Sequence, residues 1–157
     1  MEKTVCFTGH RIIQNEVYPA LKEALDAELE RQIQGGAVHF RAGGALGFDT
    51  MAALSVLSMR MQYPQIQLHL ILPCTTQTRG WSIGDARLYQ QILERADTVR
   101  YISDGYFNGV LQQRNRALVD GADVCIAYLT TSHGGTAYTA SYALKSQVEL
   151  VNLAENL

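Results

Sequence analysis

The residues best suited to bind a charged ligand lie in three short turns that contain glycine. The first turn is Thr8-Gly9-His10-Arg11, which follows a short apolar run near the N-terminus. It places a hydroxyl, an imidazole and a guanidinium next to one another, and arginine can hold a phosphate or carboxylate through two parallel hydrogen bonds. The alternative interpretation of His10 is an exposed loop residue that makes a local hydrogen bond.

The second turn lies in residues 40–49, FRAGGALGFD, between an apolar run and a helical pattern. Gly43, Gly44 and Gly47 allow backbone angles that a Cβ would penalise, and they allow close approach of a ligand to the backbone. Free amides at the start of the following helix would attract an anion. Asp49, at the helix start, could cap the helix or hold a ribose or amide group. A plain tight turn is the alternative.

This second turn is close to the dinucleotide-binding fingerprint, with alanine in the position of the first glycine. That fingerprint also requires an acidic residue about 20 residues further on. The first acidic residue after the next apolar run is Asp85, which is too distant. The sequence therefore argues against a conventional dehydrogenase.

The third turn is TTSHGGT, residues 130–136, and it again follows an apolar run and precedes a helical pattern. Gly134 and Gly135 open that helix, and the hydroxyl of Thr136 could contribute to a phosphate cradle. A helical segment at 110–119 adds Arg114-Asn115-Arg116. Residues two apart do not share a helical face, so the two guanidiniums should point in different directions.

Residues 73–84 form a polar, hydroxyl-rich segment that carries the chain's single tryptophan. Such a loop could fold over a ligand, with Arg79 and Trp81 as contacts. It could equally be a surface loop in which Trp81 packs on the domain. The sequence leaves these two interpretations open.

Size and composition favour one domain spanning residues 1–157, with 47% apolar residues and a formal charge of −2. No apolar stretch is long enough for a membrane span, and no signal peptide is evident, so a cytoplasmic location is expected. Three cysteines without metal-like spacing fit a reducing compartment. The scattered histidines predict no metal site. The charge argues against sequence-independent nucleic-acid binding.

Hydrophobic periodicity predicts an alternation of strands and helices along the whole chain. Strands are expected at 4–8, 37–40, 67–72, 98–102, 124–129 and 149–153, and helices at 16–34, 50–62, 85–96, 110–119 and 135–146. This order predicts an open, mostly parallel sheet of about six strands with helices on both faces. The three turns could then converge on one crevice at the carboxyl ends of the strands.

The TGHR turn, the GGALGFD turn, the RNRALVDGADVCIAYL segment and the GGT turn together resemble the YpsA-like branch of the SLOG superfamily. That superfamily also contains the LOG-type phosphoribohydrolases and the Smf/DprA DNA-processing proteins. The resemblance covers nearly the whole chain. It implies a Rossmann-like three-layer α/β/α sandwich, a nucleotide-type ligand such as ADP-ribose, an NAD-related compound or a nucleoside monophosphate, and is compatible with a homodimer.

The resemblance also implies which residues would form the site. The pocket for phosphate would be lined by Gly43, Gly44, Gly134, Gly135 and Thr136, and bordered by Thr8, Gly9, His10, Arg11, Asp49, Arg114 and Asn115. No certain cofactor is implied.

One position departs from the LOG-type pattern PGGxGTxxE, whose glutamate takes part in N-glycosidic cleavage. Thr139 stands where that glutamate would be, and a hydroxyl cannot act as a base near neutral pH. This favours a nucleotide-binding sensor or adaptor. The alternatives are a hydrolase of a nucleotide N-glycosidic or phosphoester bond, with Asp49 or His10 as acid–base, and a DNA-handling protein.

Overall fold

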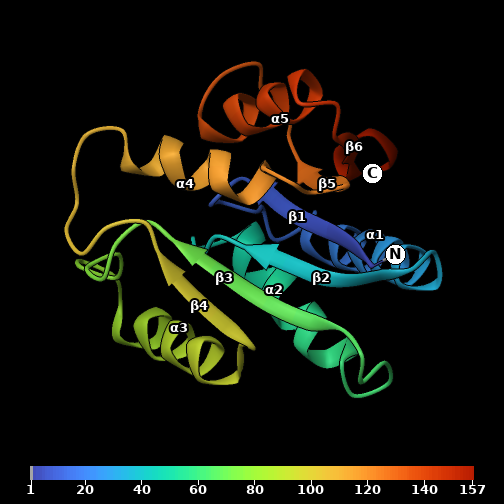
Figure 1. The fold of residues 1–157 in the computed structure, drawn as a ribbon, viewed down its shortest axis with the longest axis horizontal. Helices are drawn as coiled ribbons and strands as arrows, with labels where there is room; N and C mark the ends of the chain where they lie inside the picture. The colour runs from blue at the N-terminus through green and yellow to red at the C-terminus, as the bar shows by residue number, and fades with distance from the viewer. Residues whose placement is uncertain (1) are drawn as a thin grey trace.

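A six-stranded sheet runs through the centre of the computed structural model, which describes residues 2–157 (Figure 1). The strand order is β4-β3-β2-β1-β5-β6, and every neighbouring pair is parallel. The strands are β1 (Lys3–Gly9), β2 (Ala37–Ala42), β3 (Gln67–Leu72), β4 (Thr98–Tyr101), β5 (Val124–Tyr128) and β6 (Glu149–Asn152). The helices are α1 (Tyr18–Gln34), α2 (Phe48–Met59), α3 (Ile83–Arg95), α4 (Val110–Val119) and α5 (Gly135–Lys145), followed by a short 3₁₀ helix, Leu153–Asn156.

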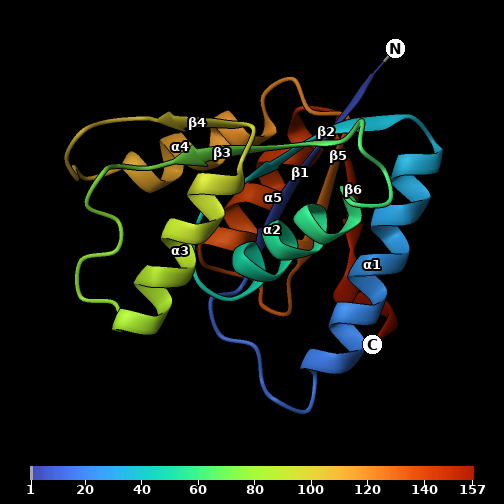
Figure 2. The ribbon, with the colours of Figure 1, turned by 90° about the horizontal axis from the view of Figure 1, so that it is seen from below.

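The helices cover the sheet from both sides. Helices α1, α2 and α3 lie together on one face, and α4 and α5 pair on the other (Figure 2). Each face of the sheet has its own hydrophobic core. Alternate residues of β1 pack into one core or the other, because successive side chains of a strand point to opposite faces. Val5 and Phe7 pack with the first group of helices, whereas Cys6 and Cys125 pack with the second. The Rossmann-like α/β/α fold predicted from the sequence is confirmed.

The chain changes direction between β1 and β5. From β1 the strands proceed in order to β4 at one edge, and α4 then carries the chain back to β5 on the other side of β1. The chain leaves β1 and β5 for helices on opposite faces of the sheet, α1 and α5. In open parallel sheets, ligands bind in the crevice outside the carboxyl ends of the strands at such a switch point.

Helix α2 begins earlier than the helix predicted at residues 50–62. Phe48 is fully buried, with its ring 6.4 Å from that of Phe7 and 6.2 Å from that of Tyr128. This packing draws the start of the helix directly onto the turn, where Gly47 precedes it with a φ of +79°. The turn and α2 are therefore one continuous unit.

Within the described residues, no helix has both the length and the apolar character needed to cross a bilayer. The three cysteines are all free thiols and all buried.

Candidate functional site

A polar crevice of about 590 Å³ opens at the carboxyl ends of β1 and β5, between α4 and α5. It brings together predicted site residues from the loop after β1, the first turn of α2, the middle of α4 and the start of α5. Those that line it are Thr8, Gly9, His10, Arg11, Asp49, Arg114, Asn115, Gly134, Gly135 and Thr136. We refer to this space below as the polar crevice.

The start of α5 supplies backbone donors to the polar crevice. The amide of Tyr138 makes the first bond within the helix, to the Gly134 carbonyl, so the amides before it have no acceptor inside the helix. Gly135 and Thr136, which carry two of these amides, line the polar crevice. The helix dipole adds partial positive charge here. Across residues 2–157, the hydroxyl of Thr136 has no hydrogen-bond partner, and neither has that of Thr8.

Arg114 brings a buried guanidinium to the polar crevice, with a side chain only 5% exposed. Its Nε donates to Oδ1 of Asn115 at 2.8 Å, and its Nη1 donates to the carbonyl oxygen of Gly43. Burial lowers the pKa of this guanidinium, while the nearby Asp49 opposes that shift. No carboxylate of the described residues lies within ion-pair distance of Arg114. Its charge is therefore not neutralised by direct contact.

Asp49 is the one carboxylate that lines the polar crevice, and it is 6% exposed. One of its oxygens accepts a hydrogen bond from the Ala45 amide at 3.2 Å. Burial raises the pKa of Asp49 from 3.8 to about 6, although Arg114, the Ala45 amide and Arg11 each oppose the shift. A carboxyl group with this pKa can exchange a proton near neutral pH.

His10 connects the loops that follow β1 and β5. Its Nε2 accepts a hydrogen bond from the Thr130 amide at 2.9 Å, which leaves the proton of the neutral ring on Nδ1. Burial lowers the pKa of His10, so the neutral ring is favoured. The ring also meets that of Tyr128 edge-on, at 5.5 Å between centroids. His10 therefore both holds the two loops together and lines the polar crevice.

Arg11 differs from Arg114 because its side chain is exposed. It forms no ion pair with any residue between 2 and 157. Its guanidinium is therefore available to an anionic ligand that enters the polar crevice. Arg116, by contrast, donates to the hydroxyl of Tyr138 at 2.9 Å. The two arginines of α4 point in different directions, as their spacing predicts.

The structure differs from the sequence-based expectation for Gly43, Gly44 and Gly47, which do not line the polar crevice. Gly43 contributes its carbonyl to Arg114. A Cβ on Gly44 would meet Leu72 at 2.4 Å, on the opposite side of the turn, and one on Gly47 would lie 2.2 Å from the carbonyl oxygen of Arg11. These contacts show that the glycines allow the turn to pack against the protein itself.

Sequence reasoning did not single out Leu111, Gln112 and Tyr138, which also line the polar crevice. Tyr138 lies three residues after Gly135 on the same helix, so helical spacing alone could have placed it on the lining face. Thr139 is fully buried, and its hydroxyl donates to the Gly135 carbonyl at 2.9 Å.

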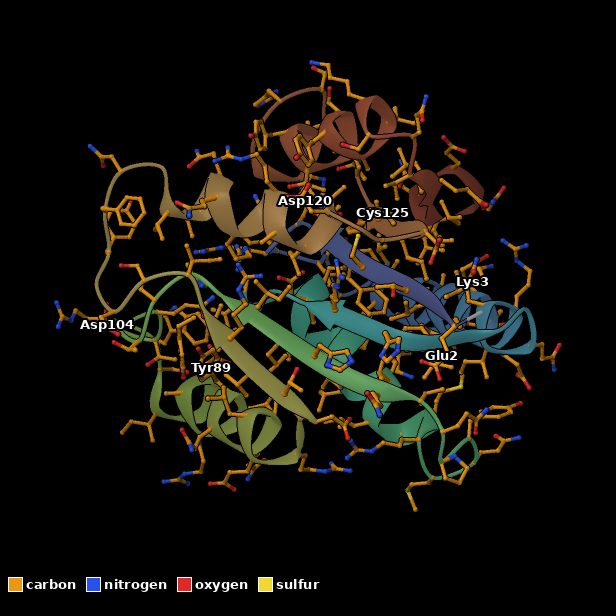
Figure 3. All side chains as sticks on the ribbon, viewed as in Figure 1. Glu2, Lys3, Tyr89, Asp104, Asp120 and Cys125 are labelled. Atoms are coloured by element: carbon orange, nitrogen blue, oxygen red, sulfur yellow. The ribbon has the colours of Figure 1, made fainter. Side chains whose placement is uncertain are left out.

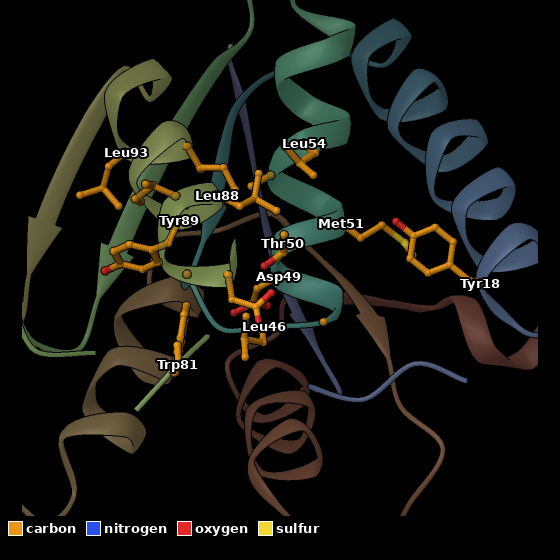
Figure 4. Close-up of a pocket in the computed structure, with 16 residues that line it drawn as sticks. Tyr18, Leu46, Asp49, Thr50, Met51, Leu54, Trp81, Leu88, Tyr89 and Leu93 are labelled. Carbon is orange, nitrogen blue, oxygen red and sulfur yellow. The ribbon is translucent and has the colours of Figure 1, made fainter. Parts of the chain in front are cut away.

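The loop with Trp81 covers a different space. The rings of Trp81 and Tyr89 are perpendicular, with centroids 5.5 Å apart. Both line a second cavity of about 230 Å³ between α2 and α3 (Figure 4). Tyr89 projects from α3, on the opposite side of the sheet from α4 and α5 (Figure 3). We call this space the apolar cavity. Arg79, the other predicted contact of this loop, is exposed and lines neither space.

The described residues form no group of three or more His, Cys, Asp or Glu side chains that could hold a metal ion. The cationic side chains and free amides that line the polar crevice suit an anionic ligand.

The fold and the polar crevice define the class of the protein: a Rossmann-like domain with a polar crevice at the switch point of its sheet. The family model for YpsA, described as the YspA SLOG family, matches residues 6–153. The chain therefore belongs to this family.

The sequence is 30% identical to a UPF0398 protein of Halalkalibacterium halodurans, over 92% of this chain and 82% of the relative. Among solved structures, DNA processing protein A of Helicobacter pylori superimposes with a TM-score of 0.67 at 22% identity, over 94% of this chain and 63% of that one. DNA processing protein A of Streptococcus pneumoniae gives a TM-score of 0.66 at 14% identity, over 94% of this chain and 49% of that one. The chain thus spans less than two thirds of either structure, and the likeness shows a shared fold.

Proposed function

We propose that the polar crevice binds a nucleotide or a nucleotide-derived ligand, such as ADP-ribose, an NAD-related compound or a nucleoside monophosphate, and that the protein acts as a sensor or adaptor. The observation that carries the proposal is the meeting of Arg11, Arg114 and the free amides of α5 in one crevice at the switch point. Membership of a SLOG family is consistent with it.

The dimensions and chemistry of the polar crevice support this ligand class. Its volume of about 590 Å³ falls in the usual range for small-molecule sites, roughly 300–1,000 Å³. The α5 amides and Arg11 suit a phosphate, because both present N–H donors and positive charge. The amide of Asn115 and the hydroxyl of Thr8 can bond to a ribose or a base.

Calorimetric titration with ADP-ribose, AMP, NAD, nicotinamide mononucleotide and free phosphate tests the proposal directly. At least one nucleotide should bind in the micromolar range or tighter. In Arg11→Ala its affinity should fall by about tenfold or more, because a charge-assisted hydrogen bond contributes about 1.5–3 kcal/mol. Binding of the matching nucleoside should be unchanged.

Arg87→Ala is the matched control, since Arg87 is exposed on α3 and lines neither the polar crevice nor the apolar cavity. A panel without any binding would overturn the proposal. Equal losses for nucleotide and nucleoside in Arg11→Ala would remove Arg11 as a phosphate contact.

A hydrolase is the second candidate, and Asp49 is the observation that favours it. Its pKa of about 6 suits a group that donates and accepts protons during a reaction. Against this, Thr139 is fully buried and bonded to Gly135, so it cannot replace the LOG-type glutamate. Incubation of the bound nucleotide, followed by NMR detection of free base or phosphate, separates the candidates. Turnover lost in Asp49→Asn would establish an enzyme.

A role with DNA has weaker support. The Helicobacter pylori relative is described by its single-stranded DNA binding mode, but that likeness establishes fold alone. The formal charge of −2 also lacks the basic footprint of such proteins. Displacement of a bound nucleotide by a short single-stranded oligonucleotide at moderate salt would support a role with DNA. We also propose a cytoplasmic location. The three free cysteines are consistent with it, because that compartment keeps thiols reduced.

A further inference from the structure

We propose that the apolar cavity between α2 and α3 is a second ligand site, and that it takes a small molecule with one aromatic ring and a short cationic amine arm. This site shares only Asp49 with the lining of the polar crevice, and it does not depend on the function proposed for that crevice. The inference rests on the walls, the charges and the volume of the cavity.

The walls are formed by aromatic and aliphatic side chains of three segments. Trp81 from the loop after β3 and Tyr89 from α3 stand perpendicular to each other. Leu54 from α2 and Leu88 from α3 also line the space (Figure 4). The perpendicular pair offers two π faces, and an aromatic ring packs well in offset or edge-to-face contact with such groups.

The charges at the apolar cavity are exclusively negative among the described residues. Two lining residues are acidic, Asp49 and Asp85, and no lysine, arginine or histidine lines the cavity. Asp85 is exposed in the first turn of α3. Within residues 2–157 its carboxylate has neither an ion pair nor a hydrogen bond. A cationic amine is the complementary group, and the neighbouring aromatic faces also attract cations.

Two hydroxyls in the lining are already occupied on their donor side. The Tyr89 hydroxyl donates to Gln77 at 3.0 Å, and the Thr50 hydroxyl donates to the Ala45 carbonyl at 3.0 Å. What these hydroxyls still offer to a ligand is acceptor capacity. At these two positions the complementary group on a ligand is an N–H donor.

The volume limits the size of the occupant. An apolar protein cavity of roughly 150 Å³ accommodates benzene, and the apolar cavity measures about 230 Å³. The space is therefore sufficient for one ring with an arm of a few atoms. It is too small for a complete nucleotide, because pockets for drug-sized ligands start at roughly 300 Å³.

The single tryptophan of the chain provides a direct readout, because Trp81 is part of the wall. The probes are 2-phenylethylamine, 2-phenylethanol and phenylacetate, which share a ring and differ in charge. We expect a saturable change in Trp81 fluorescence, with affinity in the order amine, alcohol, acid. Asp85→Asn should weaken binding of the amine by up to about fivefold, the upper end of the range for an exposed charge pair, and leave binding of the alcohol unchanged.

Two further variants distinguish the site from adventitious stacking on Trp81. Leu54→Phe adds volume inside the apolar cavity and should weaken all three probes, while Leu144→Phe, at an exposed position of α5, should weaken none. Glu94→Gln removes a charge from α3 at a position that does not line the cavity and is the control for Asp85→Asn. An unsaturable signal, equal affinity for the three probes, or binding unaffected by Leu54→Phe would each overturn the proposal.

Discussion

The polar crevice and the apolar cavity lie on opposite sides of the same glycine turn and differ in almost every property that governs binding. The polar crevice is lined by Arg11 and Arg114 together with one carboxylate. The apolar cavity is lined by two carboxylates and no cation among the described residues. Asp49 belongs to both. A single turn thus separates the proposed site for anions from the proposed site for cations.

The turn achieves this separation by directing successive residues to opposite sides. Ala45 lines the polar crevice, whereas Gly44 and Leu46 on either side of it line the apolar cavity. Two bonds fix the turn to α2: the Ala45 amide donates to Asp49, and the Ala45 carbonyl accepts from Thr50. The different lining of the two spaces therefore depends on the fixed conformation of residues 44–46.

Gly47→Ala should produce the largest loss of stability, because it changes the turn that separates the two spaces. A Cβ there would lie 2.2 Å from the Arg11 carbonyl oxygen, and the φ is +79°. Strain and backbone overlap together should cost about 3 kcal/mol or more in free energy of unfolding. Urea denaturation measures this.

Gly80→Ala is the matched control for that substitution. Gly80 has a nearly equal φ of +83°, but nothing lies within 4 Å of the added Cβ. Its cost should be about 1 kcal/mol, from strain alone. Equal losses of stability in Gly47→Ala and Gly80→Ala would show that the close packing of Gly47 against Arg11 does not constrain the turn.

Asp49→Asn should stabilise the protein at neutral and higher pH. Because Asp49 has a pKa of about 6 in the folded state, against 3.8 for an ordinary aspartate, the folded protein retains a proton between these values that the unfolded chain loses. Stability is therefore lost as pH rises through this window. The difference between variant and parent should grow from near zero at about pH 4 to at most about 3 kcal/mol above the folded pKa.

Urea denaturation of parent and variant across this pH range tests the shift, since contributions from other groups cancel in the difference. A difference that does not change with pH would mean that Asp49 is not desolvated as the structure indicates. The same variant removes a negative charge from both spaces. It should therefore strengthen nucleotide binding in the polar crevice and weaken 2-phenylethylamine in the apolar cavity.

Arg114→Met should separate the two spaces by their ligands. It removes a buried charge from the polar crevice while keeping the unbranched stem of the side chain, and Arg114 does not line the apolar cavity. Nucleotide affinity should fall by about ten- to a hundredfold, with 2-phenylethylamine affinity unchanged. Titrations of both ligands measure this. Arg116→Met, on the same helix, should change nucleotide affinity less than threefold, and a comparable loss would argue for a general effect of charge.

Much of this arrangement could be predicted from the sequence because periodicity and turn chemistry are local signals. The strand at 67–72 and the helix at 110–119 were expected with the bounds that the structure gives. The gathering of the loops after β1 and β5 follows from parallel strands sharing one edge. The spacing of Arg114 and Arg116 was sufficient to predict their different directions.

The apolar cavity could not be predicted in this way, because it depends on packing between segments distant in the chain. Nothing local shows that Trp81 meets Tyr89, or that Leu54 of α2 faces the same space. The sequence also did not determine which residues of the turn face which space. A run of glycines indicates that side chains are excluded from these positions, but it does not indicate which atoms exclude them. Gly44 was expected to face a phosphate, whereas in the structure a Cβ on Gly44 would meet Leu72.

The last prediction tests the two sides of the turn with neighbouring substitutions. A Cβ on Gly43 would lie 2.8 Å from Nη1 of Arg114, and one on Gly44 would lie 2.4 Å from Leu72 and 3.3 Å from Tyr89. Gly43→Ala should displace Arg114 and weaken nucleotide binding by about tenfold, the equivalent of one hydrogen bond to a charged group. Its effect on 2-phenylethylamine should be smaller, although the same Cβ would lie 3.0 Å from Oδ2 of Asp49, which lines both spaces.

Gly44→Ala should have the opposite pattern, because its Cβ presses into the wall of the apolar cavity. The amine probe should weaken and the Trp81 fluorescence of the free protein should change, while nucleotide affinity stays within about twofold of the parent. Since φ is +76° at Gly44, the titrations are made at a temperature where urea denaturation shows the variant to be folded. If both substitutions weakened the same ligand, the turn would be one wall of a single site, and the contrast between the two spaces would not hold.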